Sequence, residues 1–288
     1  MSGVDYLSPG TVADAVSALR AAAGSARLMA GGTDLLVQMR GGRAKPKVVI
    51  DLKGIPGLSG IRLEGGCFIV GAATPGAVLG EHEALKAAWP GVIEAANLIG
   101  STQVQGRASL GGNLCNASPA ADSVPALIAA GAVCLIEGPG GARELPVEKV
   151  QTGPGKTALA ADEILVAFRF PAKAARSSDA YLRMIPRTEM DIAVVGAGVS
   201  VSLDAGGICT AARVGIGAVA PTALLVEAAG AALVGSTFDD AALAKLEAAV
   251  AAACKPISDK RGTAEYRTKV ASVLARRAAL IARDRAKA

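Results

Sequence analysis

Residues 109–122 read Ser109-Leu110-Gly111-Gly112-Asn113-Leu114-Cys115-Asn116-Ala117-Ser118-Pro119-Ala120-Ala121-Asp122. The stretch combines two adjacent glycines with two asparagines and ends in a proline-initiated turn, after which Asp122 opens an apolar helix. Glycine lets other groups approach the backbone closely, and free N–H groups in such a turn form a concavity that binds anions. The stretch therefore predicts a phosphate cradle.

An upstream segment has the same character. Arg27-Leu28-Met29-Ala30 reads as a short buried strand and runs into Gly31-Gly32-Thr33-Asp34, after which 35–40 has the apolar spacing of a helix. A strand, a glycine turn and a helix N-terminus together present free N–H groups and a positive dipole end to a phosphate. Two such cradles predict a diphosphate ligand.

Glycine pairs alone are a weak signal, because the chain contains 35 glycines. The pairs at 65–66, 140–141 and 206–207 lie between apolar runs, which is typical of hairpin turns. The prediction of a phosphate site therefore depends on the residues around the glycine pairs at 31–32 and 111–112.

Those residues resemble a known family. The strings 28–35 and 109–113, followed by Ser118-Pro119 and Asp122, resemble the two FAD-binding signatures of the medium (flavoprotein) subunit of molybdenum hydroxylases. This family includes aerobic carbon monoxide dehydrogenase, quinoline oxidoreductase and the flavin domain of xanthine dehydrogenase. Further agreement lies at 191–193, after Arg183, and at 256–267, so the resemblance covers the whole chain.

The resemblance implies a set of FAD contacts. One segment would wrap the diphosphate and ribityl region, and it comprises Leu28, Met29, Ala30, Gly31, Gly32, Thr33, Asp34 and Leu35. A second cradle would consist of Ser109, Leu110, Gly111, Gly112 and Asn113. Asp122 would bind ribityl or adenosine hydroxyls, Leu165 would line the pocket, and Arg183 would approach the isoalloxazine or its phosphate arm.

Some of these positions also have ordinary structural interpretations. Asp122 fits a plain helix N-cap, and Arg183 fits a solvent-exposed strand residue. Ile99 stands where relatives place an aromatic residue near the flavin, so ring stacking is not implied at that position.

The resemblance also implies a fold and partners. The expected fold class is α+β, with a two-part FAD-binding domain of the vanillyl-alcohol-oxidase/PCMH type and a C-terminal antiparallel sheet with helices. A large molybdopterin subunit would hydroxylate the substrate, and a small subunit with [2Fe–2S] clusters would pass electrons to this flavin and on to an external acceptor. The implied assembly is a dimer of heterotrimers.

Composition excludes several other classes. The formal net charge is +5 with only 3% aromatic residues, which argues against a nucleic-acid module, and no apolar run is long enough for a bilayer span. The start of the sequence lacks the pattern of a signal peptide, so we expect a cytoplasmic protein.

The five cysteines lack metal spacing, and a single histidine, His82, cannot supply a triad or a histidine metal cluster. The sequence therefore predicts no metal site and no catalytic residue in this chain.

Apolar periodicity predicts three parts. Residues 1–55 read as a β-α-β subdomain with a helix capped by Thr11. Residues 56–173 read as an α+β subdomain, and 171–179 as a linker. Residues 180–288 predict strands at 180–185, 193–203 and 208–219, and then helices at 221–233, 239–254 and 263–286.

Two alternatives remain open at this point. A stand-alone FAD-dependent oxidoreductase of the same fold would need a substrate-facing set of His, Tyr or Arg residues, and His and aromatic residues are scarce. A scaffold that has lost its flavin would not need Asn113, Asp122 and both glycine pairs. Because the Rossmann fingerprint G-x-G-x-x-G is absent, FAD fits the two cradles better than NAD.

Overall fold

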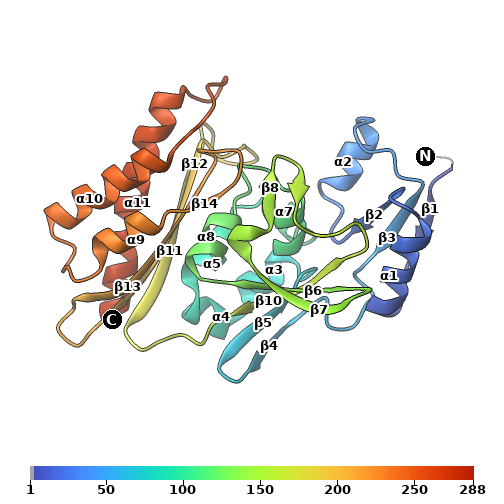
Figure 1. The fold of residues 1–288 in the computed structure, drawn as a ribbon, viewed down its shortest axis with the longest axis horizontal. Helices are drawn as coiled ribbons and strands as arrows, with labels where there is room; N and C mark the ends of the chain where they lie inside the picture. Colours follow the sequence, from blue (N-terminus) through green and yellow to red (C-terminus); the bar gives the residue numbers. More distant parts are fainter. Residues whose placement is uncertain (1–2) are drawn as a thin grey trace.

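The computed structural model describes residues 3–288 and contains three main sheets (Figure 1). The N-terminal sheet lies at one end of an elongated molecule, and the C-terminal sheet with its long helices lies at the other (Figure 1). Among these residues, no helix combines the length and hydropathy needed to cross a membrane.

The N-terminal sheet is parallel and has the order β1-β3-β2. Its elements are β1 (Asp5–Leu7), α1 (Val12–Ala21), β2 (Ala26–Met29), α2 (Leu35–Arg40) and β3 (Val48–Asp51). The Thr11 side chain accepts a hydrogen bond from the Asp14 amide at 3.1 Å, which caps α1 as predicted. The predicted small parallel sheet is therefore confirmed, although β2 is only partly buried.

The second sheet is antiparallel, with the order β4-β5-β10-β6-β7. Its strands are β4 (Ile61–Glu64), β5 (Cys67–Gly71), β6 (Val133–Gly138), β7 (Gly141–Pro146) and β10 (Ile164–Phe170). The glycine pairs at 65–66 and 140–141 form the two predicted hairpin turns, where Gly65, Gly66 and Gly141 have positive φ.

Short helices follow β5 in the chain, and one of them, α7, contains most of the glycine segment at 109–113. They are α3 (Gly76–Glu81), α4 (Glu83–Ala88), α5 (Pro90–Ala96), α6 (Thr102–Gln105), α7 (Leu110–Cys115) and α8 (Val124–Ala129). A short 3₁₀ turn, η1 (Val147–Lys149), precedes the two-stranded pair β8 (Gln151–Gly153) and β9 (Lys156–Thr157).

The C-terminal sheet is antiparallel, with the order β11-β12-β13-β14. It consists of β11 (Ser177–Met184), β12 (Val195–Leu203), β13 (Cys209–Gly217) and β14 (Leu224–Leu225), followed by α9 (Glu227–Leu233), α10 (Asp240–Ala253) and α11 (Ala264–Lys287). Helix α11 packs on β11 and β12, whereas α8 packs on β12 and β13. A Cβ at Gly215 would lie 2.2 Å from the Pro125 carbonyl oxygen, so glycine permits the close approach of α8.

Two predictions for this part of the chain are wrong in detail. The linker predicted at 171–179 ends early, because β11 begins at Ser177 and Asp179 is buried. The helix predicted at 221–233 begins only at Glu227, because Leu224 and Leu225 pair with β13 as strand β14. In both places, pairing with a neighbouring strand overrides the local sequence pattern.

Candidate functional site

The segment between β2 and α2 forms a concave turn. Gly32 has φ of +76°, which glycine adopts without strain, and the Leu36 amide donates to its carbonyl oxygen at 3.0 Å. Within the described part of the chain, the amides of Gly32, Thr33 and Asp34 donate to no protein acceptor. Successive free amides of this kind form an anion-binding nest.

Gly31 brings the two glycine segments together. A Cβ at this position would lie 1.8 Å from the Arg107 carbonyl oxygen and 2.4 Å from the carbonyl carbon. Real Cβ atoms do not approach a backbone so closely, so only glycine lets the first turn rest on residues 107–108. The second glycine segment begins immediately after this contact.

The second glycine segment differs from the predicted turn. Gly111 and Gly112 lie in the first turn of helix α7 and do not have positive φ. The Ser109 hydroxyl caps this helix by accepting a hydrogen bond from the Gly112 amide at 3.1 Å, and the Gly111 amide donates to the Ala72 carbonyl at 3.1 Å. The glycines therefore serve close packing here, since a Cβ at Gly111 would lie 2.4 Å from the Ala72 oxygen.

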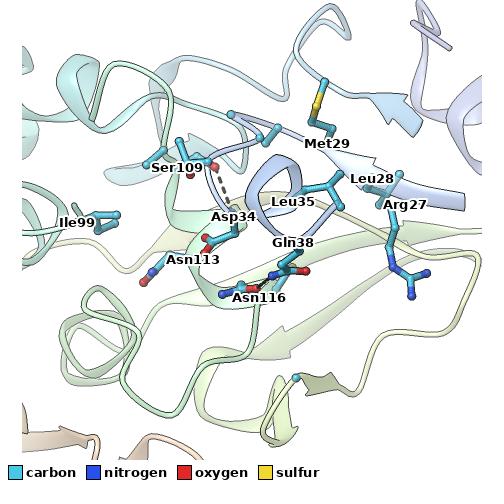
Figure 2. Close-up of a pocket in the computed structure, with 18 residues that line it drawn as sticks. Arg27, Leu28, Met29, Asp34, Leu35, Gln38, Ile99, Ser109, Asn113 and Asn116 are labelled. Carbon is cyan, nitrogen blue, oxygen red and sulfur yellow. Dashed lines mark hydrogen bonds between the residues drawn. The ribbon is translucent and has the colours of Figure 1, made fainter. Parts of the chain in front are cut away.

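A cleft of about 370 Å³ lies between the two segments (Figure 2). Ile99 lies at one end of the cleft and Arg27 at the other, with Asp34 and Asn113 between them. A second, more apolar cavity of about 420 Å³ shares Arg27, Leu28 and Gly112 with the cleft and extends to Leu165. The shared residues make the cleft and the cavity adjoining parts of one site.

Two hydrogen-bonded side chains close the cleft between α2 and α7. Gln38 Nε2 donates to Asn116 Oδ1 at 2.9 Å, although the two residues lie 78 positions apart. Figure 2 shows this contact beside Leu35. The site is thus built from two parts of the chain that meet only in the folded structure.

Asn113 is fixed by its own contacts. Its Oδ1 accepts hydrogen bonds from the Ser123 amide at 3.1 Å and the Ser123 hydroxyl at 2.7 Å. Because the carbonyl oxygen is occupied in this way, the side-chain NH₂ group is the part available to a ligand in the cleft.

A buried ion pair lies near the Ile99 end. Arg183 Nη1 donates to Asp122 Oδ1 at 3.0 Å and to the Leu98 carbonyl at 2.7 Å. Burial raises the pKa of Asp122 to about 6, although the nearby Arg183 charge acts in the opposite direction. Asp122 is therefore not a plain N-cap, and Arg183, whose side chain is only 5% exposed, is not a surface residue.

Two family models match the chain. Residues 2–173 match the FAD binding domain in molybdopterin dehydrogenase, and residues 180–282 match the CO dehydrogenase flavoprotein C-terminal domain. The chain belongs to the family of FAD-binding subunits of molybdenum-containing dehydrogenases.

Individual relatives of this FAD-subunit family agree over long alignments. The carbon monoxide dehydrogenase medium chain of Afipia carboxidovorans is 38% identical over 283 residues, which is 98% of each chain. The putative xanthine dehydrogenase FAD-binding subunit XdhB of Escherichia coli K12 is 35% identical over 219 residues, covering 75% of this chain and 74% of the relative.

Solved structures agree with this membership. Reconstituted CO dehydrogenase from Oligotropha carboxidovorans matches with a TM-score of 0.94 and 37% identity, covering 98% of both chains. Quinoline 2-oxidoreductase from Pseudomonas putida 86 matches with a TM-score of 0.90 and 26% identity, covering 99% of this chain and 98% of the other. The expected fold, a two-part FAD-binding domain followed by a C-terminal sheet domain, is confirmed.

The predicted FAD contacts fall into three groups in this FAD subunit. Those lining the cleft are Leu28, Met29, Ala30, Gly31, Gly32, Thr33, Asp34, Leu35, Ile99, Ser109, Gly112 and Asn113. Leu165 and Gly111 line the adjoining cavity. Leu110, the first residue of α7, is buried and does not line the cleft, and Asp122 and Arg183 pair with each other outside the lining of the cleft.

Sequence reasoning did not assign several residues of the FAD subunit's cleft. Arg27, Gln38, Asn116 and Gly155 line it, and Cys115 does so as well. The polar character of Gln38 at a helical position and of Asn116 after α7 was the only available signal. Among residues 3–288, no group of three or more His, Cys, Asp or Glu residues is placed to hold a metal ion.

Proposed function

We propose that this chain is the FAD-carrying electron-transfer subunit of a molybdenum hydroxylase complex. The observation that carries the proposal is the cleft between the amide nest of the first glycine turn and the Gly-Gly segment in helix α7. The chain that contains this cleft matches CO dehydrogenase medium chains along its length. FAD supplies the redox chemistry when it is bound, and the protein supplies position and electrostatics.

The residues present fit FAD. The free amides of Gly32, Thr33 and Asp34 suit the diphosphate, and the Asn113 amide offers a further donor across the cleft. The apolar cavity around Leu165 suits one flat ring system of the dinucleotide. The other ring system, the isoalloxazine of the flavin, then lies toward Ile99, at the end of the cleft nearest Leu98 and the buried Arg183.

This orientation defines a role for Arg183. A fixed cation near the flavin stabilises negative charge that develops on reduction, because the low-dielectric surroundings strengthen the interaction. We include in the proposal that Asp122 and Arg183 contribute to the flavin site at the Ile99 end of the cleft. We also include that the buried Leu110 supports the second cradle by packing.

The proposal extends to partners and assembly. A large molybdopterin subunit and a small [2Fe–2S] subunit would supply electrons, and the complex would be a dimer of heterotrimers. The relatives' names as medium chains support such partners. We also propose the cytoplasm as the compartment, which the five free cysteines fit, and a division into parts at 1–55, 56–173 and 180–288, which the separate sheets support.

Purification through a tag on this subunit, after co-expression with the neighbouring genes, tests the function. We expect FAD, identified chromatographically after release, together with iron–sulfur absorbance and two co-purifying chains. FAD without partners would favour the stand-alone FAD-dependent oxidoreductase, and colourless protein would contradict the FAD assignment.

Replacing Arg183 by alanine is expected to lower the flavin midpoint potential or the FAD occupancy, because the reduced, negatively charged flavin loses a nearby cation. Spectroelectrochemical titration of the purified complex measures the potential, and the flavin-to-protein ratio measures occupancy. An unchanged potential together with unchanged occupancy would remove Arg183 from the flavin site.

A further inference from the structure

The carboxyl ends of the three parallel strands β1, β3 and β2 are tied together by side chains. Asp51, the last residue of the central strand β3, accepts hydrogen bonds from the Tyr6 hydroxyl of β1 and from Lys53 Nζ at 2.6 Å. Lys53 Nζ also donates to the Ala30 carbonyl at 2.9 Å, just beyond the end of β2. A single ammonium group therefore joins the central strand to the start of the first glycine turn.

The Asp51 carboxylate holds the Lys53 ammonium group in place. Asp51 is 7% exposed, and the Lys53 backbone amide donates at 3.0 Å to the same carboxyl oxygen that accepts from Nζ. Burial alone would raise the pKa of Asp51, but the hydrogen bonds from Lys53 and Tyr6 hold it below its usual value. The carboxylate thus stays charged at neutral pH and fixes the position of the Lys53 ammonium.

The hydrogen bond at the Ala30 carbonyl fixes the backbone immediately before the free amides of the first glycine turn. Ala30 is followed directly by Gly31, which rests on the Arg107 carbonyl, and then by the free amides of 32–34. Lys53 therefore holds the turn from the side of the sheet, while Arg107 and Ala108 support it from the side of α7. Lys53 does not line the cleft, so it has no direct contact with a ligand there.

We propose that Lys53 is a positioning residue for the cofactor, which orients the amide nest of the first glycine turn toward the FAD diphosphate through its hydrogen bond to the Ala30 carbonyl. This inference rests on the proposed function, because it takes FAD as the ligand of the cleft. It assigns to a lysine outside the glycine segments a role in cofactor affinity.

The test compares Lys53→Met, Lys53→Gln and Lys53→Arg in the full chain after removal of bound flavin. Methionine keeps the length of the side chain and removes both hydrogen bonds, so the Kd for FAD is expected to rise about tenfold, the scale of one lost charge-assisted hydrogen bond. Arginine keeps the charge and the donors and is expected to restore most of the affinity, whereas glutamine should give an intermediate value.

ADP and a matched control separate positioning from general loosening of the fold. ADP contains the diphosphate but no flavin, so its Kd should rise by about the same factor as that of FAD. Lys47→Met, at an exposed lysine just before the opposite end of the same strand, should change neither Kd. Lys53→Met also leaves the buried Asp51 carboxylate without its ammonium partner, so its melting temperature is expected to fall below that of Lys47→Met, and each Kd is measured at a temperature at which both variants are fully folded.

Several outcomes would overturn the inference. Lys53→Met that binds FAD and ADP like the unmodified chain would do so, as would a loss of affinity that merely follows a lower melting temperature and is not restored by arginine. If Lys53→Met does not fold, the glutamine and arginine variants carry the same comparison. An unmodified chain that binds no FAD would contradict the proposed function itself, and the inference would fall with it.

Discussion

Gly31→Ala is expected to weaken FAD binding by at least about 100-fold, which corresponds to about 3 kcal/mol. The new Cβ would lie 1.8 Å from the Arg107 carbonyl oxygen, and both partners are backbone, so the contact cannot be relieved by rotating a side chain. The first glycine turn must then move away from residues 107–108, and the amide nest loses its position opposite α7. Strain of this kind should also cost about 1–3 kcal/mol of folding free energy.

Isothermal titration of the flavin-free chain with FAD measures this effect, and denaturant unfolding measures the change in stability. Gly10→Ala is the matched control, because a Cβ at Gly10 meets no atom within 4 Å and its backbone has no positive φ. A Gly31→Ala variant with the affinity of the Gly10→Ala variant would show that the contact between the two segments is not needed for binding.

Arg183→Ala is expected to lower the free energy of unfolding of the flavin-free chain by about 3 kcal/mol at pH 8. The substitution leaves the Asp122 carboxylate, whose side chain is 13% exposed, without its ionic partner. Removing one member of a buried ion pair costs more than the pair contributes, because the remaining charge stays poorly solvated. The Leu98 carbonyl also loses its donor.

The loss should depend on pH in a defined direction. The folded-state pKa of Asp122 is raised to about 6 from an ordinary 3.8, so the folded chain binds this proton more tightly than the unfolded chain does. The stability linked to this group is complete at low pH and is lost as the pH rises from about 4 through about 6. Without the Arg183 charge, the pKa of Asp122 rises further, so at pH 5 the carboxyl is neutral and the loss shrinks to about 1 kcal/mol, the value of a lost hydrogen bond.

Denaturant unfolding at pH 5 and pH 8 checks this expectation. The double variant Arg183→Ala/Asp122→Asn should recover part of the lost stability at pH 8, since asparagine cannot ionise. Equal losses at the two pH values, with no recovery in the double variant, would show that Asp122 carries no charge penalty in the folded chain.

Local sequence patterns predict the regular elements of this fold well. The Thr11 cap, the hairpins at 65–66 and 140–141 and the alternating strand at 164–170 all occur where the patterns place them. These features depend on residues within one turn or one hairpin, so a single sequence contains the information for them.

Features that depend on distant partners are predicted less well. Gly111 and Gly112 share the composition of a turn, yet they lie in a helix because α7 packs against the Ala72 carbonyl. Lys53 has no local signal for its contact with Ala30, because the strand ends must first meet in the parallel sheet. Such roles depend on which backbone atoms tertiary folding brings together.

The candidate site shows the same division. The Gly-Gly strings and the family resemblance identify most of the cleft lining, because these residues act through their own backbone. The pairing of Gln38 with Asn116 is not predicted, since an amide pair separated by 78 positions has no signature in either segment.

The contact between Gly31 and Arg107 has a consequence for the biosynthesis of the holoprotein. The cleft needs residues from Arg27 to Gly155, and the adjoining cavity needs Leu165, so no nascent chain shorter than this can offer a complete site. The N-terminal β-α-β unit emerges from the ribosome first, but its amide nest gains an opposite wall only when α7 has been made and has docked. FAD can therefore bind only after more than half of the chain has been synthesised, and until then the N-terminal β-α-β unit remains without FAD.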